Sequence, residues 1–116
     1  MAQDLRFSVL GPVRAWRGDQ ELDLGSPQQR LVLAMLLLAG GRAVGNDQLV
    51  DAVWGREQPR TALSTLRAYI SRLRRVLGDG VVFSIGDSYA LHGGLRDVAE
   101  VDDHETEPDG SERLYE

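Results

Sequence analysis

The chain has 116 residues and a mass of 12.8 kDa, which suffices for one modest core but not for a barrel enzyme or a two-domain enzyme. It contains no cysteine, which excludes disulfide scaffolds, thiolate zinc sites and cysteine nucleophiles. The longest apolar run, Leu31–Ala39, is too short to cross a bilayer. Because no signal peptide is visible either, we expect a cytoplasmic protein with no membrane partner.

The net charge of −5 conceals a division of the chain into a basic part and an acidic part. Residues 97–116 hold nine acids and one arginine, whereas residues 1–96 hold 12 arginines and nine acids. Within residues 56–75, six arginines accompany a single acid, Glu57. This asymmetry is typical of a basic binding surface with an acidic extension. We therefore predict one domain over residues 1–96, followed over 97–116 by an acidic tail or the start of a further domain.

Three short segments near the N-terminus alternate apolar and polar residues, the period of half-buried strands. They are Leu5–Leu10, Val13–Arg17 and Glu21–Leu24, separated by breaks at Gly11-Pro12 and Gly18-Asp19. They predict an antiparallel meander with one apolar face, made of Phe7, Val9, Val13, Ala15, Leu22 and Leu24. Trp16 falls on the opposite face, where it either covers a neighbouring helix or marks a contact between protomers.

The first predicted helix begins after Gly25. Ser26 suits the N-cap and Pro27 the first helical position, and Gln29 stands where it can complete a capping box. The run Leu31–Leu38 is apolar on all sides, which predicts a central, buried helix. Gly40-Gly41 ends it.

Two further helices and a hairpin follow. Asn46 can cap a helix over Asp47–Trp54, in which Trp54 is expected in the core, and a third helix is predicted over Arg60–Leu77. Val81–Ile85 and Tyr89–Leu91 predict a closing hairpin. This order indicates an α+β fold: a winged helix-turn-helix with an N-terminal antiparallel β-meander, three helices and a C-terminal β-hairpin wing.

The third helix carries the candidate chemistry. Its apolar positions form one narrow stripe made of Leu63, Leu66, Ile70, Leu73 and Leu77. The opposite side, called the outer face below, consists of Ser64, Ala68, Ser71, Arg72 and Arg75, with Thr65 at its margin. Arg67 and Arg74 flank the stripe on one side, and no acid occurs between Glu57 and Asp79.

The outer face suits the major groove of DNA. Small side chains allow a helix to approach base edges closely, and arginine can bind guanine through a bidentate fork or pair with phosphate. Flanking arginines can reach the two backbones that wall the groove. The alternative is a basic helix that packs against an acidic protein partner or against the acidic tail. The rival function is accordingly a protein-interaction winged helix that does not touch DNA.

Four motifs in series resemble the Streptomyces antibiotic regulatory protein family, whose members carry an OmpR/PhoB-type winged-helix domain. The resemblance covers about residues 5–95, and its motifs are Leu10–Val13, Gly25–Arg30, Asp47–Gly55 and Leu66–Leu77. A further segment looks like the family's wing, with Ser88 standing where a glycine is usual; it includes Gly86, Asp87, Ser88 and Tyr89.

The resemblance implies an activator of an antibiotic or other secondary-metabolite pathway, with its recognition helix in the major groove and its wing near the adjacent minor groove. It implies two protomers bound head to tail on promoter direct repeats, and an RNA polymerase contact through the loop Gly55, Arg56, Glu57, Gln58 and Pro59. Arg72 resembles the base-reading arginine, and Tyr69 and Arg74 resemble backbone-contacting positions.

Together these inferences assign base contacts to Ser64, Thr65, Ala68, Ser71 and Arg72. They assign phosphate contacts to Arg60, Arg67, Tyr69, Arg74 and Arg75. We expect no cofactor, no enzymatic activity and no metal site, because His92 and His104 are the only histidines, there is no cysteine, and a metal site needs three or four ligands. No nucleotide-binding fingerprint is present.

Overall fold

The computed structural model describes residues 5–9 and 11–92. Leu10, His104 and the predicted acidic segment 97–116 lie outside the described residues. The elements are, in order, β1 (Leu5–Ser8), β2 (Arg14–Arg17), β3 (Gln20–Glu21), α1 (Pro27–Leu38), β4 (Val44–Gly45), α2 (Asn46–Trp54), α3 (Ala62–Leu77), β5 (Val82–Ile85) and β6 (Ser88–Leu91). The predicted sequence of meander, three helices and closing hairpin is thus confirmed.

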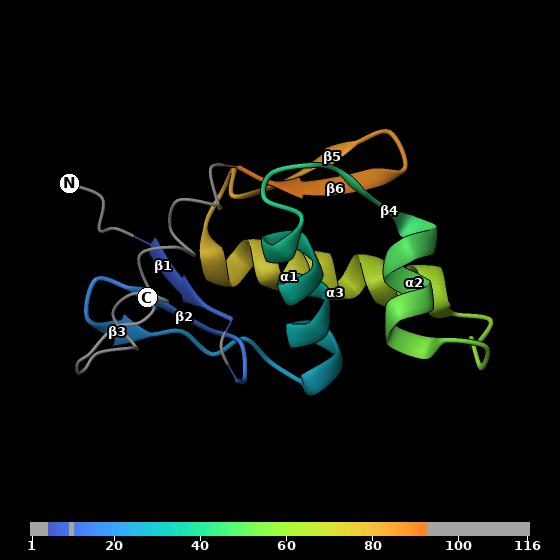
Figure 1. Ribbon diagram of the computed structural model, residues 1–116, viewed down its shortest axis with the longest axis horizontal. Coiled ribbons are helices and arrows are strands. Elements are labelled where there is room, and N and C mark those ends of the chain that lie inside the picture. Colours follow the sequence, from blue (N-terminus) through green and yellow to red (C-terminus); the bar gives the residue numbers. More distant parts are fainter. Residues whose placement is uncertain (1–4, 10, 93–116) are drawn as a thin grey trace, which may run out of the picture.

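The long helix α3 organises the molecule (Figure 1). It runs along the longest dimension, α1 crosses it, α2 lies near its N-terminal end, and the β5–β6 hairpin lies along one side. The meander occupies the opposite end from α2. Two antiparallel sheets result, ordered β1-β2-β3 and β4-β6-β5. This is the winged-helix arrangement expected from the sequence, and the β5–β6 hairpin, residues 82–91, is called the wing below.

The meander packs its predicted apolar face inward. Phe7, Ala15 and Leu24 are at most 1% exposed. The third strand is shorter than predicted and ends at Glu21, because beyond that residue only the Leu22 amide hydrogen-bonds back, to the Ala15 carbonyl.

Trp16 lies on the other face of the meander, as predicted. The guanidinium carbons of Arg6 and Arg14 stand 5.7 and 5.0 Å from its ring centre, a distance at which cation–π attraction operates.

The helix α1 begins at the predicted cap, where Ser26 Oγ accepts a hydrogen bond from the Gln29 amide at 3.2 Å. The predicted capping box is not completed, because the buried Gln29 side chain donates instead to the Leu24 carbonyl at 3.0 Å. The prediction of burial on all sides is wrong for Leu31 and Leu38, which are 39% and 68% exposed. Within the described residues α1 packs chiefly against α2, α3 and β6, and these neighbours leave Leu31 and Leu38 open to solvent.

Strand β4 was not among the predicted elements; it pairs with β6 and completes the second sheet. This pairing moves the N-cap of α2 from the predicted Asn46 to Gly45, whose amide donates to Gln48 Oε1 at 2.9 Å. The Asn46 amide donates to the Asp87 carbonyl in the turn of the wing at 2.9 Å. The beginning of α2 and the tip of the wing are therefore tied together.

The buried side of α3 completes the core. Leu66, Ile70, Leu73 and Leu77 are at most 1% exposed. Trp54, which was expected in the core, packs against it but is only partly buried. No helix within residues 5–9 and 11–92 has the length and apolar character needed to span a membrane.

Candidate nucleic-acid interface

The loop between α2 and α3 is exposed and locally ordered by hydrogen bonds. Gly55 ends α2 with a φ of 59°, a backbone conformation that favours glycine, and its carbonyl accepts from Gln58 Nε2 at 3.2 Å. The third helix starts at Ala62 rather than at the predicted Arg60, because the Ala62 amide closes a turn onto the Pro59 carbonyl. Arg60 therefore precedes the helix and is exposed. Arg56, Glu57, Gln58 and Pro59 are exposed as well.

The outer face of α3 is open to solvent. Ser64, Ser71, Arg72 and Arg75 are exposed, and Thr65 and Ala68 are half-buried. Ser64 Oγ donates to the Thr61 carbonyl at 3.1 Å, within the first turn. Most of this surface is therefore accessible, and only Thr65 and Ala68 are partly covered.

Three arginines of α3 are available to a partner. Arg67, Arg72 and Arg75 are exposed, and none of them forms a hydrogen bond or ion pair within the described part of the chain. No acid lies on the helix. The result is an exposed cationic surface whose small residues, from Ser64 to Ser71, precede Arg72 and Arg75 along the helix.

The buried side of α3 differs from the predicted apolar stripe at both edges. Leu63 is 40% exposed, whereas Ala62 and Tyr69 are buried at 6% and 8% exposure. The Tyr69 ring stacks on Trp54, with ring centres 6.3 Å apart. Its hydroxyl donates to Gln28 Oε1 at 2.6 Å. Tyr69 thus connects α3 to both other helices. Its hydroxyl proton is donated to Gln28 and is therefore not available to a phosphate.

Arg74 also differs from the other arginines of α3. It is half-buried and directed at the wing, where Nε donates to the Val82 carbonyl and Nη2 donates to Ser84 Oγ. The sequence placed Arg74 at the edge of the apolar stripe but gave no indication of these partners.

The wing ends in a two-residue turn. Ile85 pairs with Ser88, so Gly86 and Asp87 form the tip, with Gly86 at a φ of 55°. Both tip residues are exposed, as is Ile85 at 50%. Ser88 belongs to β6 rather than to the predicted turn, and Tyr89 is 9% exposed because its ring faces the core.

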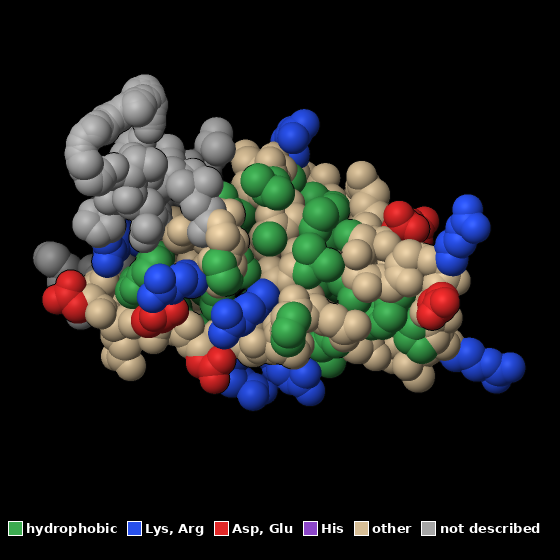
Figure 2. All heavy atoms as spheres, turned by 60° about the horizontal axis from the view of Figure 1, so that its bottom comes forward, with side chains coloured by type: hydrophobic (Ala, Val, Ile, Leu, Met, Phe, Trp, Pro, Cys, Tyr) green, Lys and Arg blue, Asp and Glu red, His purple; other side chains and the backbone are tan. Residues whose placement is uncertain are grey.

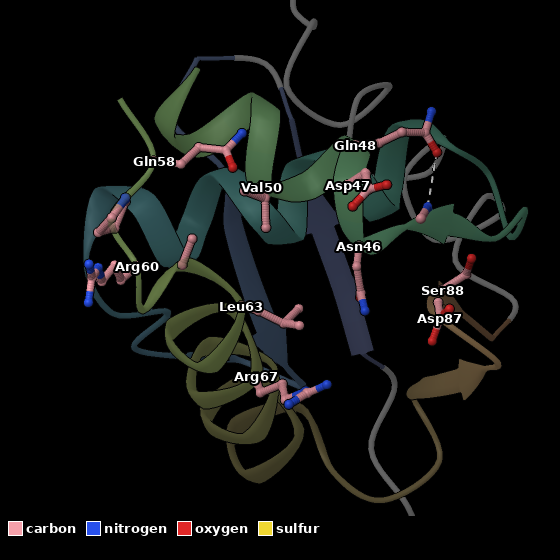
Figure 3. Close-up of a pocket in the computed structure, with 13 residues that line it drawn as sticks. Asn46, Asp47, Gln48, Val50, Gln58, Arg60, Leu63, Arg67, Asp87 and Ser88 are labelled. Carbon is pink, nitrogen blue, oxygen red and sulfur yellow. Dashed lines mark hydrogen bonds between the residues drawn. The ribbon is translucent and has the colours of Figure 1, made fainter. Parts of the chain in front are cut away.

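A hollow of about 660 Å³ separates the N-terminal end of α3 from the wing tip (Figure 3). Asn46 enters it from α2, and Leu63 and Arg67 project into it from α3. Asn46 Oδ1 is buried and has no hydrogen-bond partner among the described residues. The wall of the hollow is thus polar and partly cationic, with Arg60 and Arg67 on one side and Asp87 and Ser88 of the wing on the other.

Hydrophobic side chains also remain open at the surface. Figure 2 shows them among arginines on the face that was at the bottom of Figure 1. No cluster of three or more His, Asp or Glu side chains suited to a metal occurs in the described ranges 5–9 and 11–92.

The fold and its exposed cationic helix define a winged-helix domain of the class found in transcriptional regulators. The chain belongs to the family described as "Transcriptional regulatory protein, C terminal", which matches residues 19–84. It is 52% identical over 102 residues to the regulatory protein AfsR of Streptomyces coelicolor, covering 85% of this chain and 10% of AfsR. It is 45% identical over 80 residues to the transcriptional regulatory protein MoaR1 of Mycobacterium tuberculosis, covering 69% of this chain and 26% of MoaR1.

Solved structures agree with this membership. EmbR of Mycobacterium tuberculosis, in complex with a low-affinity phosphopeptide, superposes with a TM-score of 0.69 and 31% identity over 77% of this chain and 25% of that chain. The C-terminal domain of the nisin resistance regulator NsrR superposes with a TM-score of 0.58 and 23% identity, over 73% of this chain and 90% of that chain. This second likeness shows the fold alone. The resemblance to the Streptomyces antibiotic regulatory proteins is confirmed. The chain spans only a tenth to a quarter of the length of AfsR and MoaR1.

Proposed function

We propose that this domain binds promoter DNA sequence-specifically, with α3 in the major groove and the wing at the adjacent minor groove. The observation that carries the proposal is the outer face of α3, which offers small side chains to solvent together with arginines that have no partner among the described residues, and which contains no acid. A helix of this composition can enter the major groove closely and offset the charge of the flanking phosphates.

Individual roles follow from exposure. We assign base-edge contacts to Ser64, Thr65, Ala68, Ser71 and Arg72, which lie on the outer face. Phosphate contacts are assigned to Arg60, Arg67 and Arg75, whose guanidinium groups are exposed and not engaged elsewhere in the described structure. Tyr69 is left out of this set because its hydroxyl is bonded to Gln28.

The finer proposal concerns the biological setting. The domain would act in the cytoplasm, on the nucleoid, as part of an activator of an antibiotic or other secondary-metabolite pathway, with two protomers head to tail on direct repeats. The exposed loop Gly55–Pro59 would contact RNA polymerase while α3 occupies the DNA. In support, Arg56, Glu57, Gln58 and Pro59 of this loop are exposed, and none of them belongs to the outer face of α3.

Selection of bound sequences from a random DNA pool tests the proposed function. We expect enrichment of a short motif that recurs as a direct repeat at a fixed spacing. Absence of enrichment would contradict the proposal. If a pull-down from nuclease-treated extract then retained a protein partner, the protein-interaction alternative would be favoured.

A matched pair of variants tests the division of roles on the selected site. Arg72→Ala should weaken specific binding by about 1–3 kcal/mol and bring it closer to binding of random DNA. Arg75→Ala, three residues further along the same face, should weaken binding to both DNAs alike. Equal losses on both DNAs for Arg72→Ala would overturn its assignment to base reading.

A further inference from the structure

The Arg74 side chain joins α3 to both strands of the wing. Its Nε donates to the Val82 carbonyl at 3.1 Å, and its Nη2 donates to Ser84 Oγ at 2.8 Å, both in β5. Its guanidinium carbon lies 5.9 Å from the ring centre of Tyr89 in β6. The guanidinium group of Arg74 therefore contacts the wing at three points.

These contacts distinguish Arg74 from the arginines around it. Arg72 and Arg75 are exposed and make no such contacts, whereas Arg74 is half-buried. A guanidinium group holds its donors in a fixed fork and can lie against an aromatic ring at the same time, which an ammonium group cannot reproduce. The requirement at this position is thus for the shape of arginine as well as for its charge.

Arg74 adds to a small number of contacts that hold the outer half of the wing, namely the pairing of β4 with Ser88 and Tyr89 and the bond from the Asn46 amide to the Asp87 carbonyl. A small isolated hairpin is marginal in water without packing against another element. Ile85 near the tip is 50% exposed, and strand β4, which flanks β6, contributes only two residues. Between the tip contact at Asp87 and the buried base of the hairpin, Arg74 supplies a direct side-chain connection to α3.

We propose that Arg74 is a positioning residue that fixes the angle between α3 and the wing, and that it does not contact a phosphate. The inference rests on the proposed function, in which α3 and the wing occupy adjacent grooves of one duplex. A change in their angle would misplace the wing while α3 remains in the major groove. Arg74 thereby sets the distance between the two halves of the footprint.

The first test needs no DNA. Amide hydrogen exchange is compared for the wild-type protein, Arg74→Ala and the control Arg75→Ala, with thermal melting to verify folding. We expect faster exchange in the wing, residues 82–91, for Arg74→Ala alone, with α3 unchanged. If the wing amides of Arg74→Ala exchanged as slowly as those of the wild-type protein, the inference would be overturned. Should that variant fail to fold, Ser84→Ala removes one of the three contacts and should accelerate exchange in the same residues.

The second test uses the selected DNA site. Hydroxyl-radical footprints and the salt dependence of affinity are measured for Arg74→Ala, Arg74→Lys and Arg75→Ala. Both Arg74 variants should lose the minor-groove protection given by the wing, keep the major-groove protection and keep the wild-type salt slope. Arg75→Ala should keep both protections and reduce the log–log slope by about 0.9, the contribution of one phosphate.

The possible failures can be told apart. A reduced salt slope with an intact footprint for Arg74→Ala, or full rescue by Arg74→Lys, would show a phosphate contact or a simple charge effect and overturn the inference. If the wild-type domain bound no DNA, the proposed function would fall, and with it the role of Arg74 in the footprint. The exchange experiment would still decide whether Arg74 holds the wing to α3.

Discussion

The salt dependence of DNA binding follows directly from the arginines that the structure leaves exposed. Arg60, Arg67 and Arg75 are assigned to phosphates, and each neutralised phosphate releases condensed counterions. At a higher salt concentration the released counterions gain less entropy, so affinity falls with a slope that counts the contacts.

The magnitude can be worked from these three contacts. At about 0.9 per phosphate, they give a log–log slope of roughly −2.7 per protomer. Raising the salt concentration fourfold, from about 50 to about 200 mM, should then weaken binding about 40-fold. Removing one contact, as in Arg67→Ala, should bring the slope to roughly −1.8.

Fluorescence anisotropy with a labelled duplex, titrated at four or more salt concentrations, measures this slope. The exposed variant Leu38→Ala, on α1 and away from the outer face, is a matched control that should keep the wild-type slope. A flat response for the wild-type protein, or an unchanged slope for Arg67→Ala, would refute the assignment of these arginines to phosphates.

Three further predictions concern a buried leucine, the hydroxyl group of Tyr69 and the pKa of Glu21. Leu73→Ala, at a fully buried position of α3, should lower the free energy of unfolding by about 2–5 kcal/mol in urea, while Leu38→Ala should change it by no more than about 0.5 kcal/mol; similar losses would contradict the packing described. Tyr69→Phe should cost about 0.5–1.5 kcal/mol for the lost hydrogen bond and leave the salt slope of DNA binding unchanged; a reduced slope would restore the phosphate role that the structure speaks against. Arg14 lowers the pKa of Glu21, chiefly through its hydrogen bonds, so Arg14→Ala should raise that pKa toward the usual carboxyl range in an NMR titration, and an unchanged titration would contradict this cause.

The elements that could be predicted from the sequence are those with a local signature. Alternation identified the meander, and Ser26-Pro27 marked the start of α1 because the cap and the proline act through neighbouring backbone groups. Strand β4 could not be found in this way. It has two residues, too few to show a period, and exists only because β6 lies beside it.

The periodicity of apolar residues along α3 does not predict which side chains at the margins of the stripe are buried. Leu63 and Tyr69 lie at opposite margins of the apolar stripe, and spacing along the helix does not decide which margin is covered. The answer depends on where Trp54 and Gln28 sit, since they contact Tyr69 and leave Leu63 open. In the same way, the sequence shows that Arg74 is cationic but not that its Nε and Nη2 donate hydrogen bonds to the wing.

Chemical-shift mapping by NMR with the selected duplex would test most directly whether the exposed side of α3 is the surface that meets DNA. Our account predicts that the largest amide shifts fall on α3 around Ser64, Ala68 and Arg72, with a second group at the wing tip, Gly86-Asp87. Shifts confined to the meander or to the exposed side of α1, with α3 unaffected, would contradict it.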